Sequence, residues 1–529
     1  MNTVLLHELP LERAHVAPRA VALKTADAQV SYESLATSIA NFAAGVAALG
    51  VARGERVAIY LEKRAEFVVA CFGTAAAGAV FVPINPLLKA PQVGHILRDC
   101  GATLLVTSDE RLPLVAGELA QCPDLRHVVI VGDAAAIAPA ARVATHGWSA
   151  LLEHAPRALP RVIDVDMVAI LYTSGSTGRP KGVVLSHRNM VAGAKSVAEY
   201  LENTADDTLL AALPFSFDAG FSQLTTAFHT GARVVLLNYV LPGDVTRALA
   251  RERVTGLTAV PPLWIQLCQV KWPESIATHL RYIANTGGRM PFATLAELRK
   301  RLPQTKPFLM YGLTEAFRST YLPPAEVDRR PDSIGKAIPN AEILVLRPDG
   351  TRCAPDEPGE LVHRGALVGM GYWNDAEKTA ERYRPLPGRE AGLVLPEVAV
   401  FSGDTVRMDA DGFLYFIGRR DEMIKTSGYR VSPTEVEEAI YATRRVAECA
   451  AFGVPHAALG EAIVVVATPA DGTALDIDGL LAECKPKLPA YMLPARVHVK
   501  TGSLPRNPNG KIDRKALAEE FAAVAAAAS

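Results

Sequence analysis

Short apolar runs alternate with helical segments through the first half of the chain. The runs are rich in valine, isoleucine and leucine, and between them apolar residues recur at helical spacing. Strands that alternate with helices form parallel sheets whose two faces are covered. The pattern therefore predicts parallel sheets built from strands at 56–60, 102–107, 127–131, 167–171, 207–213, 232–237 and 256–260.

The pattern changes after about residue 311, where the apolar runs shorten and turn residues become frequent. The run at 342–346 precedes Pro-Asp-Gly, and residues 409–412 join two further runs, so we predict an antiparallel section. Beyond residue 419 a charged stretch leads into a compact α+β pattern. The expected fold class is α/β, with a large N-terminal domain (1–420) and a small C-terminal domain (421–529).

Residues 67–88 carry no charged side chain over a length that just spans a bilayer. Gly73, Gly78 and Pro83 interrupt this run, so we predict a helix, a short strand at 79–82 and a turn instead of a membrane helix. The opening residues carry acids where a secretion signal is basic, and their apolar run is too short. We therefore expect a cytoplasmic protein without a membrane partner.

Composition narrows the function classes further. Lysine plus arginine number 55 against 56 for aspartate plus glutamate, which argues against a nucleic-acid partner bound by bulk charge. The 7 cysteines are scattered without a close pair, so neither a zinc site nor a disulfide scaffold is expected. Reduced thiols fit the cytoplasm.

Residues 172–187, YTSGSTGRPKGVVLSH, combine hydroxyl residues, glycines and a lysine between two apolar segments. We interpret them as a strand-to-helix connection that holds polyphosphate, because glycines let backbone N–H groups approach an anion and a lysine adds positive charge. The spacing does not fit a P-loop, and an ordinary solvated turn needs fewer donors. The candidate phosphate contacts are Thr173, Ser174, Gly175, Ser176, Thr177, Gly178 and Lys181.

Two further polar groups follow predicted strands, at 286–289 (TGGR) and 311–315 (YGLTE). Strand ends in open α/β sheets are where ligands collect. The ring of Tyr311 can stack on a purine, the Thr314 hydroxyl can bond a phosphate, and Glu315 can hold magnesium on polyphosphate.

Three charged residues later in the chain complete this set of candidates. Asp404 has two carboxylate oxygens that can accept both hydroxyls of a ribose, and Arg419 is a nearby cation. Lys511 follows a turn-forming Asn-Gly, so its ammonium lies on a loop that can be presented to another part of the protein.

With these motifs in this order, the chain resembles the adenylate-forming superfamily of acyl-CoA synthetases, nonribosomal peptide synthetase adenylation domains and firefly luciferase over nearly its whole length. The resemblance implies an enzyme that uses ATP and Mg²⁺ to convert a carboxylate into an acyl-adenylate, releases pyrophosphate, and then transfers the acyl group to a thiol. It also implies two αβα-layered subdomains and a β-barrel-like subdomain in the large domain, with a mobile C-terminal domain.

The resemblance assigns roles to the motif residues. The catalytic candidates are Lys511, Thr314, Glu315 and Lys181; Lys511 also follows from charge, because a cation relieves the repulsion between a carboxylate and a phosphate. By similarity, residues 173–181 hold the β and γ phosphates, Gly287, Gly288, Arg289 and Tyr311 form the adenine site, Thr314 contacts the α-phosphate, Glu315 binds magnesium, Asp404 and Arg419 contact the ribose, and Asp421 is the hinge.

The pair Phe217-Asp218 bears on the acid that is activated. Many fatty acyl and aryl members have a histidine and then an apolar residue here, whereas this pair resembles amino-acid-activating enzymes, in which the aspartate binds the substrate ammonium. A carboxylate that faces an apolar pocket needs a cation. Two interpretations stay open: Asp218 binds a substrate amine, or it caps a helix that begins at Ala219.

Similarity also predicts the residues that line the acid pocket. Within that set Arg318 pairs either with a buried carboxylate of the protein, which we prefer, or with a second carboxylate on the substrate. The predicted lining consists of Phe217, Asp218, Ala219, Ser222, Ala284, Met310, Arg318 and Ser319.

The leading substrate hypothesis is a β-amino or proline-like acid that is loaded onto a separate carrier protein. The alternative is an AMP-forming ligase that joins a fatty or aryl acid to coenzyme A; Lys425 and Gly428, on the expected pantetheine face, do not separate the two. A luciferase-like oxidative enzyme is a further class. A non-catalytic nucleotide-binding protein is disfavoured because Lys511, Glu315 and Asp404 are all present.

Overall fold

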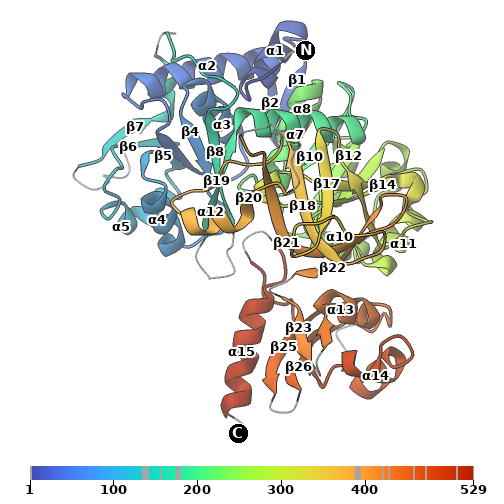
Figure 1. Ribbon diagram of the computed structural model, residues 1–529. Helices are drawn as coiled ribbons and strands as arrows, with labels where there is room; N and C mark the ends of the chain where they lie inside the picture. The colour runs from blue at the N-terminus through green and yellow to red at the C-terminus, as the bar shows by residue number, and fades with distance from the viewer. Residues whose placement is uncertain are drawn as a thin grey trace.

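The computed structural model describes residues 3–133, 142–154, 158–173, 180–387, 395–419, 422–426, 429–456, 459–470, 474–507 and 510–527. Figure 1 shows a large body that contains the N-terminal part of the chain and a small body that contains its C-terminal part. Two sheets lie in the large body and a third lies in the small one. The expected α/β class, with a large N-terminal and a small C-terminal domain, is confirmed.

The first sheet has the strand order β19-β9-β8-β4-β3-β5-β6-β7. Its strands from β8 to β7 run parallel, while β9 and β19 are antiparallel additions at one edge. The strands are β3 (Arg56–Tyr60), β4 (Val80–Pro83), β5 (Ala102–Ser108), β6 (His127–Val131), β7 (Ala144–Gly147), β8 (Met167–Thr173), β9 (Lys181–Ser186) and β19 (Gly371–Tyr372). The accompanying helices are α2 (Tyr32–Ala48), α3 (Ala65–Ala76), α4 (Ala90–Asp99), α5 (Leu112–Leu119) and α6 (Trp148–Leu152).

The second sheet begins with a parallel section in the order β14-β13-β12-β10-β11-β1, which the hairpin strand β2 closes. Its strands are β1 (Val21–Lys24), β2 (Gln29–Ser31), β10 (Thr208–Ala211), β11 (Arg233–Leu236), β12 (Gly256–Ala259), β13 (Tyr282–Asn285) and β14 (Lys306–Tyr311). The helices are α1 (Glu8–Val16), α7 (His187–Tyr200), α8 (Asp218–Thr230), α9 (Pro242–Arg251), α10 (Pro261–Cys268) and α11 (Phe292–Arg301).

The predicted antiparallel section continues this second sheet. Strand β15 pairs with β14 on one side and with β16 on the other, so the section is hydrogen-bonded to the parallel strands. Its elements are β15 (Thr320–Leu322), β16 (Ser333–Ala337), β17 (Ala341–Leu346), β18 (Gly359–Gly365), α12 (Ala376–Arg382), β20 (Tyr383–Pro385), β21 (Val398–Met408) and β22 (Leu414–Arg419).

The small body is a sheet in the order β24-β23-β26-β25, with β27 beside β26. Strand β22 of the large body ends at Arg419 and β23 begins at Ile424, on either side of the predicted boundary. The elements are β23 (Ile424–Thr426), β24 (Tyr429–Val431), α13 (Pro433–Tyr441), β25 (Val446–His456), β26 (Gly460–Pro469), α14 (Ile477–Cys484), β27 (Arg496–Val499) and α15 (Arg514–Ala527).

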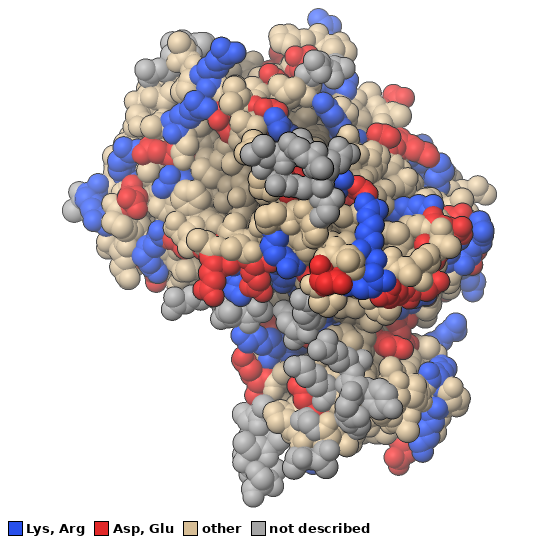
Figure 2. Space-filling model, in the orientation of Figure 1, with Lys and Arg blue, Asp and Glu red and all other residues tan. Residues whose placement is uncertain are grey.

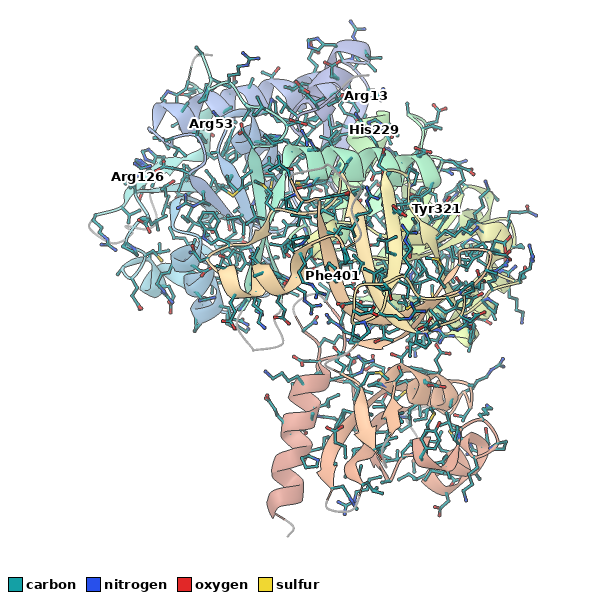
Figure 3. All side chains as sticks on the ribbon, in the orientation of Figure 1. Arg13, Arg53, Arg126, His229, Tyr321 and Phe401 are labelled. Carbon is teal, nitrogen blue, oxygen red and sulfur yellow. The ribbon has the colours of Figure 1, made fainter. Side chains whose placement is uncertain are left out.

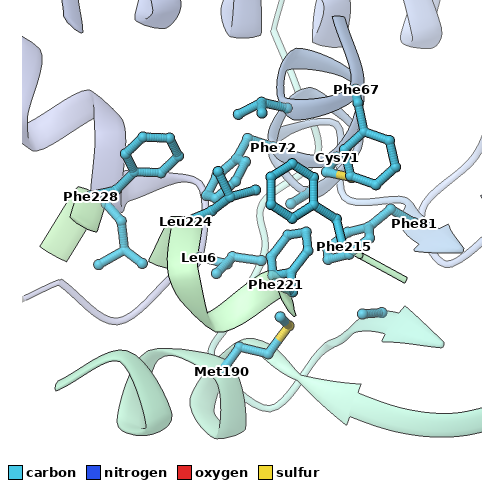
Figure 4. Packing of buried hydrophobic residues seen from close by; sticks show 14 of the residues in the cluster. Leu6, Phe67, Cys71, Phe72, Phe81, Met190, Phe215, Phe221, Leu224 and Phe228 are labelled. Carbon is cyan, nitrogen blue, oxygen red and sulfur yellow. The ribbon is translucent and has the colours of Figure 1, made fainter. Parts of the chain in front are cut away.

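Aromatic rings from α3 and α8 join the two sheets of the large body. Phe72 of α3 stacks on Phe221 of α8 with ring centroids 5.9 Å apart, and Phe221 also stacks on Phe81 of β4 at 5.0 Å (Figure 4). Such contacts add to the free energy gained from burying apolar surface. Helix α8 is therefore held firmly, and its N-terminus enters the candidate site. At its other end, Arg13 of α1 donates a hydrogen bond to the carbonyl of His229 (Figure 3).

The uncharged segment 67–88 folds as expected, into α3, β4 and a turn within the first sheet layer. Among the described residues, no helix combines the length and apolar character that crossing a bilayer requires. Acidic and basic side chains are interspersed on the face in Figure 2, as the balanced composition suggests.

One predicted connection is wrong. Residues 172–187 were expected to join a strand directly to a helix, but Lys181–Ser186 form strand β9, which pairs antiparallel with β8. Helix α7 begins only at His187, where the Ser186 side chain caps it by accepting a hydrogen bond from Asn189 N. The run Gly-Val-Val-Leu after Lys181 is short, apolar and rich in valine, so it forms a buried strand beside β8.

Lys63 links the two sheets and predicts a pH effect on stability. Its Nζ donates hydrogen bonds to the carbonyls of Ala211 (3.1 Å) and Ala212 (2.7 Å) at the end of β10, and burial lowers its pKa from 10.5 to about 7. Between these pH values the unfolded chain binds the extra proton, so stability rises with pH. We expect Lys63→Met to flatten this rise, measured as the denaturation midpoint between pH 7 and 10. Lys300→Met, at an exposed lysine, should leave it unchanged. Equal changes of midpoint with pH in the two variants would contradict the role of Lys63.

Candidate active site

The nucleotide candidates gather where the parallel strands of the second sheet end. Tyr311 is the last residue of β14, and its hydroxyl donates a hydrogen bond to Oδ2 of Asp404 in β21. Oδ1 of the same carboxylate accepts a hydrogen bond from Nε of Arg419 at 3.2 Å. The fold thus brings together three residues that lie far apart in sequence.

The Asp404 carboxylate is buried and lies beside a cation. It is 8% exposed, and burial raises its pKa whereas the Arg419 guanidinium opposes that rise. Burial and the nearby carboxylate also raise the pKa of the Tyr311 hydroxyl, which stays a hydrogen-bond donor. Because each carboxylate oxygen has two lone pairs, Asp404 can accept further hydrogen bonds from sugar hydroxyls while it keeps both protein donors.

Thr314 and Glu315 lie on a short helical turn directly after β14. Tyr372 of β19 donates a hydrogen bond of 2.5 Å to Oε1 of Glu315, which fixes the carboxylate beside the phosphate loop strands. A single carboxylate suits magnesium, which keeps waters and substrate phosphates as its other ligands. Within the described ranges, no three His, Cys, Asp or Glu side chains gather as metal ligands.

Lys511 extends from the small body into the large one. Gly287 follows β13 with φ +77°, and a Cβ at that position would be 3.1 Å from Cε and 3.7 Å from Nζ of Lys511. Burial lowers the pKa of Lys511, while the Asp218 carboxylate favours its charged form. An ion pair of 3.2 Å between Arg289 and Glu438 of α13 joins the two bodies beside this point.

Gly287 supplies a test of this close approach. We expect Gly287→Ala to slow adenylate formation by about tenfold to a hundredfold, because its methyl group displaces Lys511. Gly502→Ala is the matched control, with φ +80° and open space around the position. Both changes place an alanine in the left-handed region of the backbone, which costs about 1 kcal/mol of stability. Adenylation rates are measured by pyrophosphate exchange. Equal rates in the two variants would show that Lys511 does not act from its position beside Gly287.

Asp218 has a partner inside the protein. Nη1 of Arg318 lies 2.7 Å from Oδ2 of Asp218, and Thr314 Oγ1 donates a 3.0 Å hydrogen bond to Oδ1. Helix α8 begins at Asp218 with Phe217 as its N-cap, and no side chain makes a capping bond there. The capping interpretation is therefore wrong, and the internal ion pair that we preferred for Arg318 is present, with Asp218 as its carboxylate.

A small cavity lies against α8 and contains part of the predicted acid pocket. Its volume of about 20 Å³ holds roughly one water molecule. Four residues of the predicted set do not line it: Phe217, Asp218, Ala284 and Ser319. Ser319 is fully buried, and its hydroxyl shares a hydrogen bond of 3.0 Å with Nδ1 of His363. The lining residues are Val197, Leu201, Leu209, Leu210, Ala219, Ser222, Gln223, Thr226, Gly256, Thr258, Tyr282, Met310 and Arg318.

The phosphate loop is only partly within the described structure. Thr173 and Lys181 are register partners at the open ends of β8 and β9, so the two ends of the loop meet. Ser174, Gly175, Ser176, Thr177 and Gly178 lie outside the described residues, as do the hinge candidate Asp421 and Gly428.

Sequence reasoning missed two residues that the structure places at the site. Tyr372 orients Glu315, and Glu438 pairs with Arg289 across the two bodies. No local motif marks either of them. Their roles follow from contacts between segments that are distant in sequence.

Comparison with known proteins gives matches over nearly the whole chain. Two family models match, "AMP-binding enzyme" over residues 11–373 and "AMP-binding enzyme C-terminal domain" over residues 435–511. A feruloyl-CoA synthase from Amycolatopsis sp is 32% identical over 97% of this chain and 98% of its own length. An L-proline–[L-prolyl-carrier protein] ligase from Pseudomonas fluorescens is 31% identical over 98% and 99%. A solved o-succinylbenzoate coenzyme A synthetase from Bacillus subtilis, in complex with ATP and a magnesium ion, aligns with a TM-score of 0.80 and 27% identity over 96% and 98%.

Proposed function

Because this chain belongs to the AMP-binding enzyme family and is an AMP-forming ligase that uses ATP and Mg²⁺, we propose that its two bodies cooperate to activate one carboxylic acid and pass it to a pantetheine thiol. The observation that carries the proposal is the approach of Lys511 of the small body to Gly287, just after β13 in the large body.

In the first half-reaction a carboxylate oxygen of the acid attacks the α-phosphorus of ATP, and pyrophosphate leaves. Two anions must meet in this step, and charge grows on the phosphoryl oxygens. Lys511 would relieve both from one side. Asp404, Arg419 and Tyr311 would hold the ribose and base, so that the α-phosphate cannot drift from the lysine. The Mg²⁺ on Glu315 would neutralise the leaving pyrophosphate.

In the second half-reaction the thiol attacks the acyl carbon and AMP leaves. Lys511 lies beside Gly287, where the acid and the nucleotide would meet, so we propose that the small domain turns about Asp421 before the thiol enters. The Arg289–Glu438 ion pair would break in this movement. The domain division at residue 421 is part of this proposal.

Two classes of acid remain as candidates, and a specific observation favours each. The Asp218–Arg318 ion pair supports an acid without an amine, because the carboxylate already has its cation. The pair Phe217-Asp218 and the likeness to a prolyl-carrier ligase support an amino acid, β-amino or proline-like. We propose the amine-free acid as the better fit to the geometry. The thiol of coenzyme A or that of a separate carrier protein would then be the acceptor.

Exchange of labelled pyrophosphate into ATP tests the acid directly. Simple carboxylic, 2-oxo, 2-hydroxy, α-amino, β-amino and imino acids are compared at equal concentration. We expect exchange with amine-free acids; exchange with amine-bearing acids alone would reinstate the amino-acid hypothesis, and exchange with none would refute the proposed activity. Mass measurement of the acyl product with coenzyme A and with a carrier protein identifies the thiol.

A further inference from the structure

Asp218 already has a cation and a hydroxyl donor inside the protein. Thr314 donates to one of its oxygens and Arg318 to the other, at 3.0 and 2.7 Å. Arg318 is only 2% exposed, so this pairing is not loosened by solvent. A substrate ammonium that approached Asp218 would therefore lie close to the guanidinium of Arg318, and two like charges in a buried site repel strongly.

The backbone fixes the guanidinium in this position. Phe317, the preceding residue, has φ +56° and ψ −45°, and Arg318 N donates a 2.5 Å hydrogen bond to Ala316 O across it. This is a γ-turn of the rare, strained kind. The Phe317 ring is fully buried and lies against Gly193 of α7, where a Cβ would come within 2.3 Å of it. Strain that is held by packing in this way is common at functional sites.

Arg318 also lines the small cavity beside α8, together with Ser222, Thr226 and Thr258. Its Nε–H is buried and has no hydrogen-bond partner in the described structure, and the same holds for Oε1 of Gln223. A buried donor without a partner is unfavourable and is rare in folded proteins. An acceptor oxygen brought by the substrate would satisfy the arginine.

We propose that Arg318 stands where an amino-acid substrate would place its ammonium group, and that it selects carboxylic acids which lack a free amine and carry an acceptor oxygen for its Nε–H. The acceptor is a carbonyl, hydroxyl or second carboxylate oxygen. This inference rests on the proposed function and names the substrate class for the same site. Arg318 is then a specificity-determining residue, with Asp218 as the group that holds it.

The test compares wild type with Arg318→Met in pyrophosphate exchange, using acids of one carbon skeleton that bear a 2-amino, 2-hydroxy, 2-oxo or no substituent, and a dicarboxylic acid. Wild type should prefer an oxygen-bearing acid to its amine counterpart. Arg318→Met exposes Asp218 to an ammonium and removes the donor, so the amine-to-oxygen ratio of kcat/KM should rise at least about tenfold. An unchanged ratio, or a wild-type preference for the amine, would overturn the inference.

Two further variants keep the test decisive if Arg318→Met folds poorly. Arg318→Lys retains the charge but loses the planar donors, so it should still exclude amines while its preference for oxygen-bearing over unsubstituted acids falls about tenfold. The double variant Asp218→Asn with Arg318→Met has no buried charge and should gain no amine activity. Either result in the opposite direction would refute the role of Arg318, whereas exchange by wild type with no acid at all would refute the proposed function instead.

Discussion

Lys511→Ala is expected to slow adenylate formation by about a hundredfold to a thousandfold, which corresponds to roughly 3 kcal/mol of lost transition-state stabilisation. The reason is that Lys511 is the cation that the small body presents beside Gly287, where the carboxylate and the α-phosphate would meet. The second half-reaction, started from preformed acyl-adenylate and thiol, should keep most of its rate because the proposed domain rotation would remove the lysine from the site before this step.

The two half-reactions are measured separately, by pyrophosphate exchange and by thioester formation. Lys515→Ala is the matched control, since this lysine lies four residues further along on the exposed part of α15. It should leave both rates unchanged. A Lys511→Ala enzyme that loses both half-reactions equally would remove the lysine from its proposed role.

Arg318→Met is expected to lower the free energy of unfolding by about 3 to 5 kcal/mol, because it leaves Asp218 as a buried carboxylate without its arginine partner. The double variant with Asp218→Asn should recover most of that loss, since neither charge then remains. Chemical denaturation, followed by a probe in the large body, measures the change in midpoint.

Arg299→Met provides the comparison for the Arg318 change. Arg299 pairs with Asp328 on the surface, and their side chains are 41% and 73% exposed. Its loss should change the stability by no more than about 1 kcal/mol. If the two variants were equally stable, or if the double variant were no better than Arg318→Met alone, Asp218 and Arg318 would not be coupled as the structure indicates.

The sequence was most informative about the parallel strands. Strands buried on both faces appear as continuous apolar runs, so β3 (Arg56–Tyr60) and β6 (His127–Val131) were predicted with their observed bounds. Strand β9 was missed because it is a short antiparallel addition beside β8, inside the stretch that was interpreted as a connection. Its existence depends on pairing with β8, which no local pattern records.

The candidate site could also be predicted from the sequence only in part. Tyr311, Asp404 and Arg419 were recognised as chemically suited to a nucleotide, and the fold brings them into contact. For Asp218 and Arg318 the sequence showed only that each needs a partner of opposite charge. Their separation of 100 residues hid the fact that each is the partner of the other, and this contact changes the expected substrate.

The central claim is that a carboxylate oxygen attacks the α-phosphorus of ATP at the site beside Gly287 that Lys511 approaches. It is tested most directly with an acid that supports exchange, labelled with ¹⁸O in its carboxylate, in a complete turnover with ATP and thiol. We predict one labelled oxygen atom in the AMP that is formed and none in pyrophosphate. Unlabelled AMP, or label in an inorganic phosphate product, would contradict the account.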